Sequence, residues 1–221
     1  MASEHDLPYV CIPAGTRNHF AADLGVDRGD IVGSLDAFAH GIERRIDLAR
    51  VNGRVFVNNA SLGVYAKIVQ SDEYRDAKVE TVAEMLPELL PPRAEPFDLD
   101  FRAPDGTEWH GAQLLLVSNN PYRLPRPGTA GARGSLDAGV LGVLAVRILQ
   151  AGELVALMAT EATGAPPRFP GWLDFAAREF VVETEGETVD IAMDGEAGVM
   201  EAPLRFESLP GALRIRVLPA R

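Results

Sequence analysis

Short apolar runs separated by turn residues fill the second half of the sequence, and their spacing constrains the fold more than any other feature. Gly, Pro, Asn and Asp stand between the runs, as in tight turns. The runs that we interpret as strands are residues 97–102, 108–117, 140–147, 175–183, 189–193, 204–209 and 212–218. Many short strands joined by turns predict an α+β chain built mainly on an antiparallel β-sandwich.

A strong hairpin signal lies upstream of these runs. Asn52-Gly53 separates the run 46–51 from the run 55–57. An Asn-Gly pair between two alternating runs is the strongest short-range indication of a β-hairpin. Two further segments have helical patterns, one at 71–90 that two prolines end and one at 152–160.

The first forty residues follow a different pattern. The expected elements are a buried strand at 8–12, a small-residue turn at 14–16, a helix at 18–24 and a helix at 31–40. Asn18 is the expected N-cap of the first helix, Gly25 follows its end, and Asp30 is the expected N-cap of the second. A strand, a turn and two helices predict a small α/β element ahead of the sandwich.

The charge balance limits the possible partners. The sequence has 21 Lys and Arg against 32 Asp and Glu residues, a net charge of -11. Because nucleic-acid binding needs clustered basic side chains, we expect no nucleic-acid partner.

No apolar run is long enough to span a bilayer, and residues 1–7 lack the apolar core of a secretory signal. Cys11 is the only cysteine, and its apolar neighbours predict a buried, unreactive thiol. These features favour a cytoplasmic protein.

Residues 12–21 are the first candidate for chemistry. A strand, a small-residue turn and a helix N-terminus follow one another there, and such a junction exposes backbone N–H groups that suit a phosphate. Thr16 adds a hydroxyl group, and Asn18 can donate to a ligand as well as cap the helix. The plainer interpretation is an ordinary strand–helix connection.

Asp194-Gly195-Glu196 is the second candidate. Two carboxylates on one turn would suit proton transfer or metal binding. The plainer interpretation is a hairpin turn, for which Asp-Gly is a common choice. The two interpretations are compatible, since a general base can lie on a turn.

Blocks of the sequence occur in the order of one family's motifs. They are P-A-G-T-R-N-H-F-A at 13–21, I-D-L at 46–48, V-N-G-R-V-F-V-N at 51–58 with Gly at 63, M-D-G-E at 193–196 and L-R-I-R-V at 213–217. They resemble the motifs of the diacylglycerol kinase family, which includes bacterial lipid kinases and sphingosine and ceramide kinases. The resemblance implies that residues 1–43 are a remnant of a Rossmann-like nucleotide-binding domain and residues 44–221 the β-sandwich C-terminal domain.

The resemblance also implies roles for individual residues. Gly15, Thr16 and Asn18 would border the phosphates of ATP. Glu196 would be the general base that takes the proton of a lipid hydroxyl, with Asp194 supporting the site or a metal such as Mg²⁺. A further metal ligand would come from a segment similar to L-D-D-G-L-L-D, in which this chain offers only Asp137. Diacylglycerol is one lipid substrate that this implies.

Three departures from the family pattern bear on activity. Arg17 stands where a small residue is usual, and Ala138 replaces an acid that the family uses as a metal ligand. The glycine-rich loop G-G-D-G-T is not found, and the one Asp-Gly-Thr, at 105–107, is expected to be a hairpin turn. We therefore expect the chain to be inactive alone.

Three interpretations remain open at this point. The chain is a truncated lipid kinase, a non-catalytic lipid-binding or oligomerisation module derived from one, or an unrelated β-sandwich binding protein. Residues 9–12 and the helix from Ile31 would normally pack on a nucleotide-binding half, so their apolar faces should lie exposed or be covered by another copy. We expect a homo-oligomer through the N-terminal segment, together with peripheral membrane contact. Residues 85–90 and the loop near Trp172 are candidates for lining an acyl pocket.

Overall fold

The structure, a computed structural model, describes residues 2–15, 18–64, 66, 97–122, 133–148, 153 and 169–219. The helices expected at 71–90 and 152–160 lie outside the described residues. So do Thr16, Arg17 and the apolar segment 85–90.

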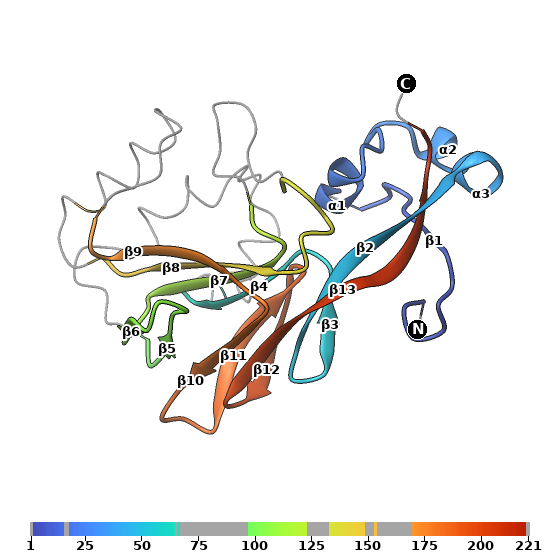
Figure 1. The fold of residues 1–221 in the computed structure, drawn as a ribbon. Coiled ribbons are helices and arrows are strands. Elements are labelled where there is room, and N and C mark those ends of the chain that lie inside the picture. The colour runs from blue at the N-terminus through green and yellow to red at the C-terminus, as the bar shows by residue number, and fades with distance from the viewer. Residues whose placement is uncertain are drawn as a thin grey trace.

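One of the two sheets contains seven strands (Figure 1). Its order is β3 (Arg54–Phe56), β2 (Ile42–Val51), β13 (Leu204–Val217), β10 (Glu179–Glu183), β5 (Asp100–Arg102) and β6 (Glu108–Trp109). The seventh strand, β1 (Tyr9–Val10), pairs in parallel with the end of β13, and the other pairs are antiparallel.

The second sheet is antiparallel throughout. Its order is β12 (Glu196–Glu201), β11 (Thr188–Met193), β4 (Asn59–Gly63), β7 (Leu114–Asn119), β8 (Leu141–Val146) and β9 (Trp172–Ala177). Alternate residues of each strand point to the same face. In β7 and β8 both faces are apolar: Leu115 and Val143 belong to one buried cluster, whereas Leu114 and Val146 belong to another.

The main core lies between the two sheets. Phe56, Phe180 and Phe206 from the first sheet pack in one cluster with Leu62 and Ile191 from the second. Two sheets that bury one common apolar layer form a sandwich, and the predicted β-sandwich is confirmed.

A second cluster joins the N-terminal segment to the sandwich. Helix α1 (His19–Asp23) is followed by two single-turn helices, α2 (Ile31–Ser34) and α3 (Ala37–His40). All three gather at the ends of β2 and β13 that project beyond the sandwich (Figure 1). Leu24, which follows α1, is buried there with Ile46, Leu48 and Ile215. The long strands thus serve both parts of the chain.

Several predicted elements have different bounds. The run 175–183 is two strands, because the chain bends at Arg178 and crosses from the second sheet to the first. The runs 204–209 and 212–218 are instead one strand, β13, with an irregularity between Leu209 and Leu213. The run 108–117 is also divided between the sheets, into β6 and β7.

The two helices predicted near the N-terminus lie where expected but differ in detail. The helix expected at 31–40 is interrupted after Ser34, and its apolar side chains face solvent, with Ile31 48% and Phe38 59% exposed. This exposure was expected for a face without its usual partner. Asp30 caps α2 through Gly33 N–H, at 2.7 Å. Asn18 makes no side-chain capping bond, which corrects that prediction.

Asp47 is a buried carboxylate that holds two distant loops. It is 2% exposed. Its oxygens accept hydrogen bonds from Gly139 N–H at 2.7 Å and from Gly211 N–H at 2.8 Å. Since a buried charge is tolerated only when it is hydrogen-bonded, Asp47 ties the segment before β8 and the irregular part of β13 to β2.

We predict that Asp47→Asn destabilises the chain by about 1–3 kcal/mol, because the amide group turns one buried acceptor into a donor that faces an N–H group. Urea denaturation followed by circular dichroism measures this. Asp36→Asn is the control, since Asp36 is exposed and makes no capping bond. Equal midpoints for the two variants would contradict the role given to Asp47.

The thiol of Cys11 is half-buried against the second cluster, and burial raises its pKa. A raised pKa lowers the thiolate fraction at any pH below it. We therefore predict that iodoacetamide alkylates Cys11 more slowly at pH 8 than it alkylates glutathione, and that urea removes the difference. Equal rates for the folded chain and glutathione would show that the thiol is reactive.

Candidate functional site

The turn before α1 is shaped by the side chain of Asn18. Its Oδ1 accepts a hydrogen bond from Gly15 N–H at 2.9 Å, and its Nδ2 donates to the Pro13 carbonyl at 3.1 Å. Asn18 has φ 48°, a left-handed conformation that asparagine tolerates better than most residues. The turn is thus closed from within, and Ala14 and Gly15 are exposed on it.

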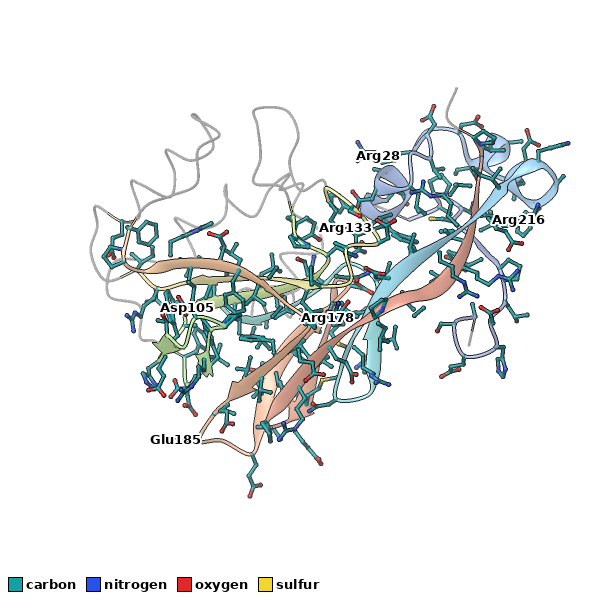
Figure 2. The ribbon with its side chains drawn as sticks, viewed as in Figure 1. Arg28, Asp105, Arg133, Arg178, Glu185 and Arg216 are labelled. Atoms are coloured by element: carbon teal, nitrogen blue, oxygen red, sulfur yellow. The ribbon has the colours of Figure 1, made fainter. Side chains whose placement is uncertain are left out.

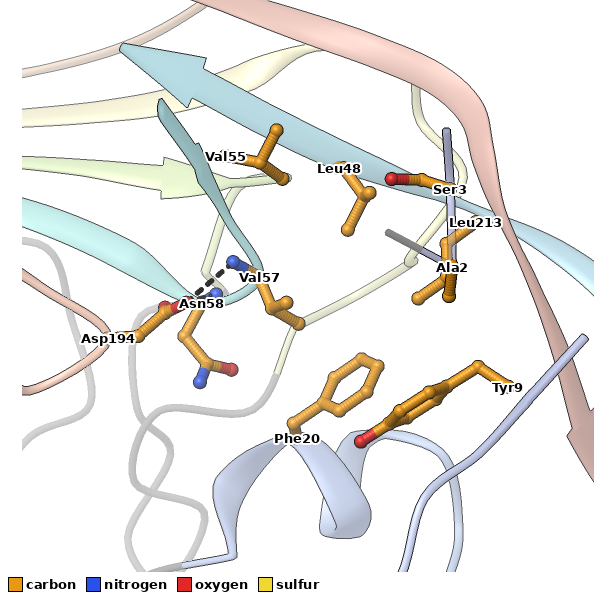
Figure 3. A pocket seen from close by; sticks show the side chains of 10 residues that line it. All are labelled: Ala2, Ser3, Tyr9, Phe20, Leu48, Val55, Val57, Asn58, Asp194 and Leu213. Atoms are coloured by element: carbon orange, nitrogen blue, oxygen red, sulfur yellow. Dashed lines mark hydrogen bonds between the residues drawn. The ribbon is translucent and has the colours of Figure 1, made fainter. Parts of the chain in front are cut away.

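The second candidate segment is a tight hairpin between β11 and β12. Asp194 and Gly195 have φ values of 50° and 88°, which suit an Asp-Gly turn. The Asp194 carboxylate accepts hydrogen bonds from the N–H groups of Val57 at 2.8 Å and Asn58 at 2.7 Å (Figure 3). It also accepts one from Asn59 N–H at 3.2 Å. Because both of its oxygens are used in this way, Asp194 acts as a structural anchor for the turn.

Glu196 is placed differently. It is the first residue of β12, and its side chain is 82% exposed. Its carboxylate lies 4.0 Å from the guanidinium of Arg54, a contact that is weak at such exposure. Of the two carboxylates on this turn, Glu196 is therefore the one available to a ligand.

A groove of about 390 Å³ joins the N-terminal segment to the sandwich (Figure 3). Its walls are Ala2, Ser3, Tyr9, Phe20, Leu48, Val55, Val57, Asn58, Asp194 and Leu213. The side chains of Phe20 and Tyr9 lie on one side, and Asp194 lies at one end beside Asn58 (Figure 3). A mostly apolar groove with a polar end matches an amphiphilic ligand.

Arg133 crosses from the sandwich to α1 and was not singled out in the sequence. Its guanidinium pairs with Asp23, the last residue of α1, with side-chain exposures of 0% and 8%. Figure 2 shows Arg133 beside α1. It also donates to the carbonyls of Val57 at 2.7 Å and Asn119 at 3.1 Å and to Oδ1 of Asn58 at 3.1 Å. The guanidinium lies 5.9 Å from the ring centre of Phe20.

Tyr122 completes this region from the sandwich side. Its hydroxyl accepts a hydrogen bond from Asn59 Nδ2 at 2.9 Å. Burial raises its pKa, although the hydrogen bond from Asn59 opposes that shift. The hydroxyl therefore stays protonated at neutral pH and supports the loop that begins β4.

Asp137 bonds within its own segment of the chain. It is exposed and bonds to the hydroxyl of Ser135, two residues earlier. Among the residues that the structure describes, no three His, Cys, Asp or Glu side chains cluster as metal ligands do. Asp137 as a metal ligand therefore stays a prediction.

Asp105-Gly106-Thr107 is a hairpin turn, as expected. It connects β5 to β6, and Thr107 N–H donates to Asp105 Oδ1 at 2.9 Å. Figure 2 shows Asp105 at the end of the sandwich away from α1.

The structure thus places Gly15 and Asn18 on one turn and Asp194 and Glu196 on another, with the groove between α1 and the second turn. Asp23 and Arg133 were missed because a pair 110 residues apart leaves no local pattern. Apolar residues on both sides of Arg133 in the sequence would have indicated a buried arginine. Arg133 instead follows a stretch rich in Gly and Pro that is typical of an ordinary loop.

Comparison with known proteins agrees with the fold and the motifs. A family model, the diacylglycerol kinase catalytic domain, matches residues 1–51. A probable YegS-like lipid kinase of Pseudomonas aeruginosa strain PAO1 is 31% identical over 95% of this chain and 67% of its own length. The diacylglycerol kinase of Bacillus subtilis strain 168 is 26% identical over 86% of this chain.

Solved structures show the same fold. The crystal structure of a putative diacylglycerol kinase from Bacillus anthracis strain Sterne aligns with a TM-score of 0.68 and 23% identity, covering 95% of this chain and 69% of that one. A second crystal structure of a diacylglycerol kinase from this strain aligns with a TM-score of 0.61 and 20% identity, covering 94% of this chain and 66% of that one.

The chain spans 62% of the length of the Bacillus subtilis relative and 67% of that of the Pseudomonas relative. None of the helices that the structure describes is long and apolar enough to cross a membrane. The ordered motifs, the sandwich and the 31% identity with the Pseudomonas relative together show that this chain belongs to the bacterial diacylglycerol and lipid kinase family.

Proposed function

We propose that this chain forms the acceptor side of an enzyme that transfers the terminal phosphoryl group of ATP to the hydroxyl group of a lipid such as diacylglycerol. The observation that carries this proposal is the exposed Glu196 carboxylate on a turn that Asp194 anchors beside an amphiphilic groove. An exposed carboxylate whose one ion-pair contact, to Arg54, is weak is suited to accept a proton, and the groove is suited to the apolar part of a lipid.

In this proposal Glu196 is the general base. Its carboxylate takes the proton of the lipid hydroxyl, whose oxygen attacks the terminal phosphorus of ATP while ADP leaves in line. Asp194 holds the turn in place through the three N–H groups of residues 57–59. The turn at 13–18 borders the phosphates, with Gly15 exposed there and Thr16 adding a hydroxyl.

Mg²⁺ would neutralise charge on the phosphates during transfer. Both Asp194 oxygens already accept backbone N–H groups, and the described residues form no cluster of metal ligands. These residues do not make a metal cage.

A second candidate function is a non-catalytic lipid-binding or oligomerisation module. Ile31, Val32, Leu35, Phe38 and Ile42 are each between 47% and 77% exposed around α2 and α3, and exposed apolar side chains in one segment favour an interface. We propose a homo-oligomer through this segment. We also propose a cytoplasmic enzyme that contacts the membrane peripherally, where its lipid substrate resides.

We predict that the 221-residue chain does not phosphorylate diacylglycerol alone, because the G-G-D-G-T loop of the family is not among its residues. Transfer of labelled phosphate from ATP to diacylglycerol in mixed micelles with Mg²⁺ measures this. Robust turnover would show that the chain builds its nucleotide site from other residues.

The role of Glu196 is tested by fusing the chain behind a family member's Rossmann-like half that carries this loop. We predict that the fusion is active and that Glu196→Gln lowers its kcat by about 100-fold or more with KM little changed, since the amide cannot accept the proton. Glu201→Gln, exposed at the other end of β12, is the control and should retain activity. Equal kcat values for the two variants would rule out Glu196 as the base.

A further inference from the structure

The side chain of Arg133 makes four hydrogen bonds and a further ion-pair contact. A guanidinium has five N–H groups. Nε donates to Asp23, Nη1 donates to the carbonyls of Val57 and Asn119, and Nη2 faces Asp23 and Asn58 Oδ1. Because the side chain is fully buried, each of these contacts is made without competition from water.

The segment Val57–Asn59 is held from two sides. Its N–H groups donate to the Asp194 carboxylate, while the Val57 carbonyl and the Asn58 side chain accept from Arg133. The Asp194 N–H group returns a bond to the Asn59 carbonyl at 2.9 Å. A shift of this segment therefore changes the contacts of both Arg133 and Asp194.

Arg133 holds α1 at the same time. Besides the side-chain pair, its backbone N–H donates to Asp23 Oδ1 at 3.3 Å, and its guanidinium lies over Phe20. Helix α1 starts directly after Asn18, whose side chain bonds to Pro13 and Gly15. One buried side chain thus connects the helix that follows the first turn to the segment that anchors the second.

We infer that Arg133 is a positioning residue that sets the Asp194-Gly195-Glu196 turn relative to α1 and the turn at 13–18. The inference rests on the proposed function, which makes these two turns the opposite sides of a phosphoryl-transfer site. Phosphoryl transfer depends on placing the base and the phosphate in line, so a displacement of either side reduces the rate without removing a reacting group.

The experiment tests whether Arg133 and the segment Val57–Asn59 are coupled, in the 221-residue chain without ATP or lipid. Amide hydrogen exchange, followed by NMR, is measured for Val57, Asn58, Asn59 and Asp194. The variants are Asn58→Ala, which removes one acceptor of Arg133, and the double variant Asp23→Leu/Arg133→Met, which replaces the buried pair by apolar side chains and so avoids an unpaired buried charge. Val182→Ala is the control, a core variant that lowers stability elsewhere.

In both variants we expect exchange of the four amides to accelerate, relative to the unmutated chain, at least about fivefold more than exchange of the amides of β7 and β8. This factor is the lower end of the coupling usual between linked sites. In the control, all these amides should change together. If the double variant does not fold, Asn58→Ala alone decides. Equal acceleration of the four amides and of β7 and β8 in Asn58→Ala would overturn the inference.

Linkage between sites is reciprocal, which gives a second readout. Asp194→Asn removes the charge that orients residues 57–59, so exchange of the Arg133 Nε–H group should also accelerate. An unchanged Nε–H exchange rate would show that Arg133 only fills space in the fold. Neither result depends on kinase activity, so failure of the proposed function and failure of this inference remain distinguishable.

Discussion

The pairing of β2 with β13 is the interaction on which the rest of the structure depends. The two strands pair from Val51 and Phe206 at one end to Ile42 and Val217 at the other. Half of their length contributes Val51 and Phe206 to the sandwich core, and the other half contributes Ile46 and Ile215 to the cluster beneath α1. This pair therefore supplies most of the buried apolar residues on which the N-terminal segment packs.

Polar groups then adjust the geometry that the strands establish. Asp47, Asp194 and Arg133 each satisfy several backbone groups from distant parts of the chain. A buried charge with a full set of partners rigidifies its surroundings, because any movement leaves a group unsatisfied. Asp194 lies at the surface, and its three bonds to backbone N–H groups make it an anchor, whereas its neighbour Glu196 is 82% exposed and makes only a weak contact with Arg54.

Local patterns were sufficient to predict much of the fold. Asn52-Gly53 and Asp105-Gly106 form the predicted hairpin turns, since turn conformation depends on the residues within the turn. The crossing of the chain between sheets at Arg178 was not predictable in this way. Phe175 and Phe180 point into the same core from opposite sheets. The apolar pattern of residues 175–183 is the same for one straight strand as for two strands joined by a bend.

The candidate site shows the same limit. The motifs at 13–18 and 194–196 were found because they are contiguous in sequence. The sequence did not predict that Asn18 closes its own turn. Its amide group could either cap the helix or close the turn, and the sequence does not distinguish these two uses. Arg133 and Asp23 meet only through the tertiary fold, and the ion pair has no sequence pattern of its own.

The central claim, that the turn carrying Glu196 and the adjoining groove receive a lipid alcohol, has one direct test. A short-chain diacylglycerol is titrated into the isotope-labelled chain below its critical micelle concentration, and backbone NMR shifts are followed. The account predicts saturable shifts at Val57, Asn58 and residues 194–196, with the amides of β5 and β6 unaffected. Shifts that are absent, or confined to parts of the chain away from this turn, would contradict it.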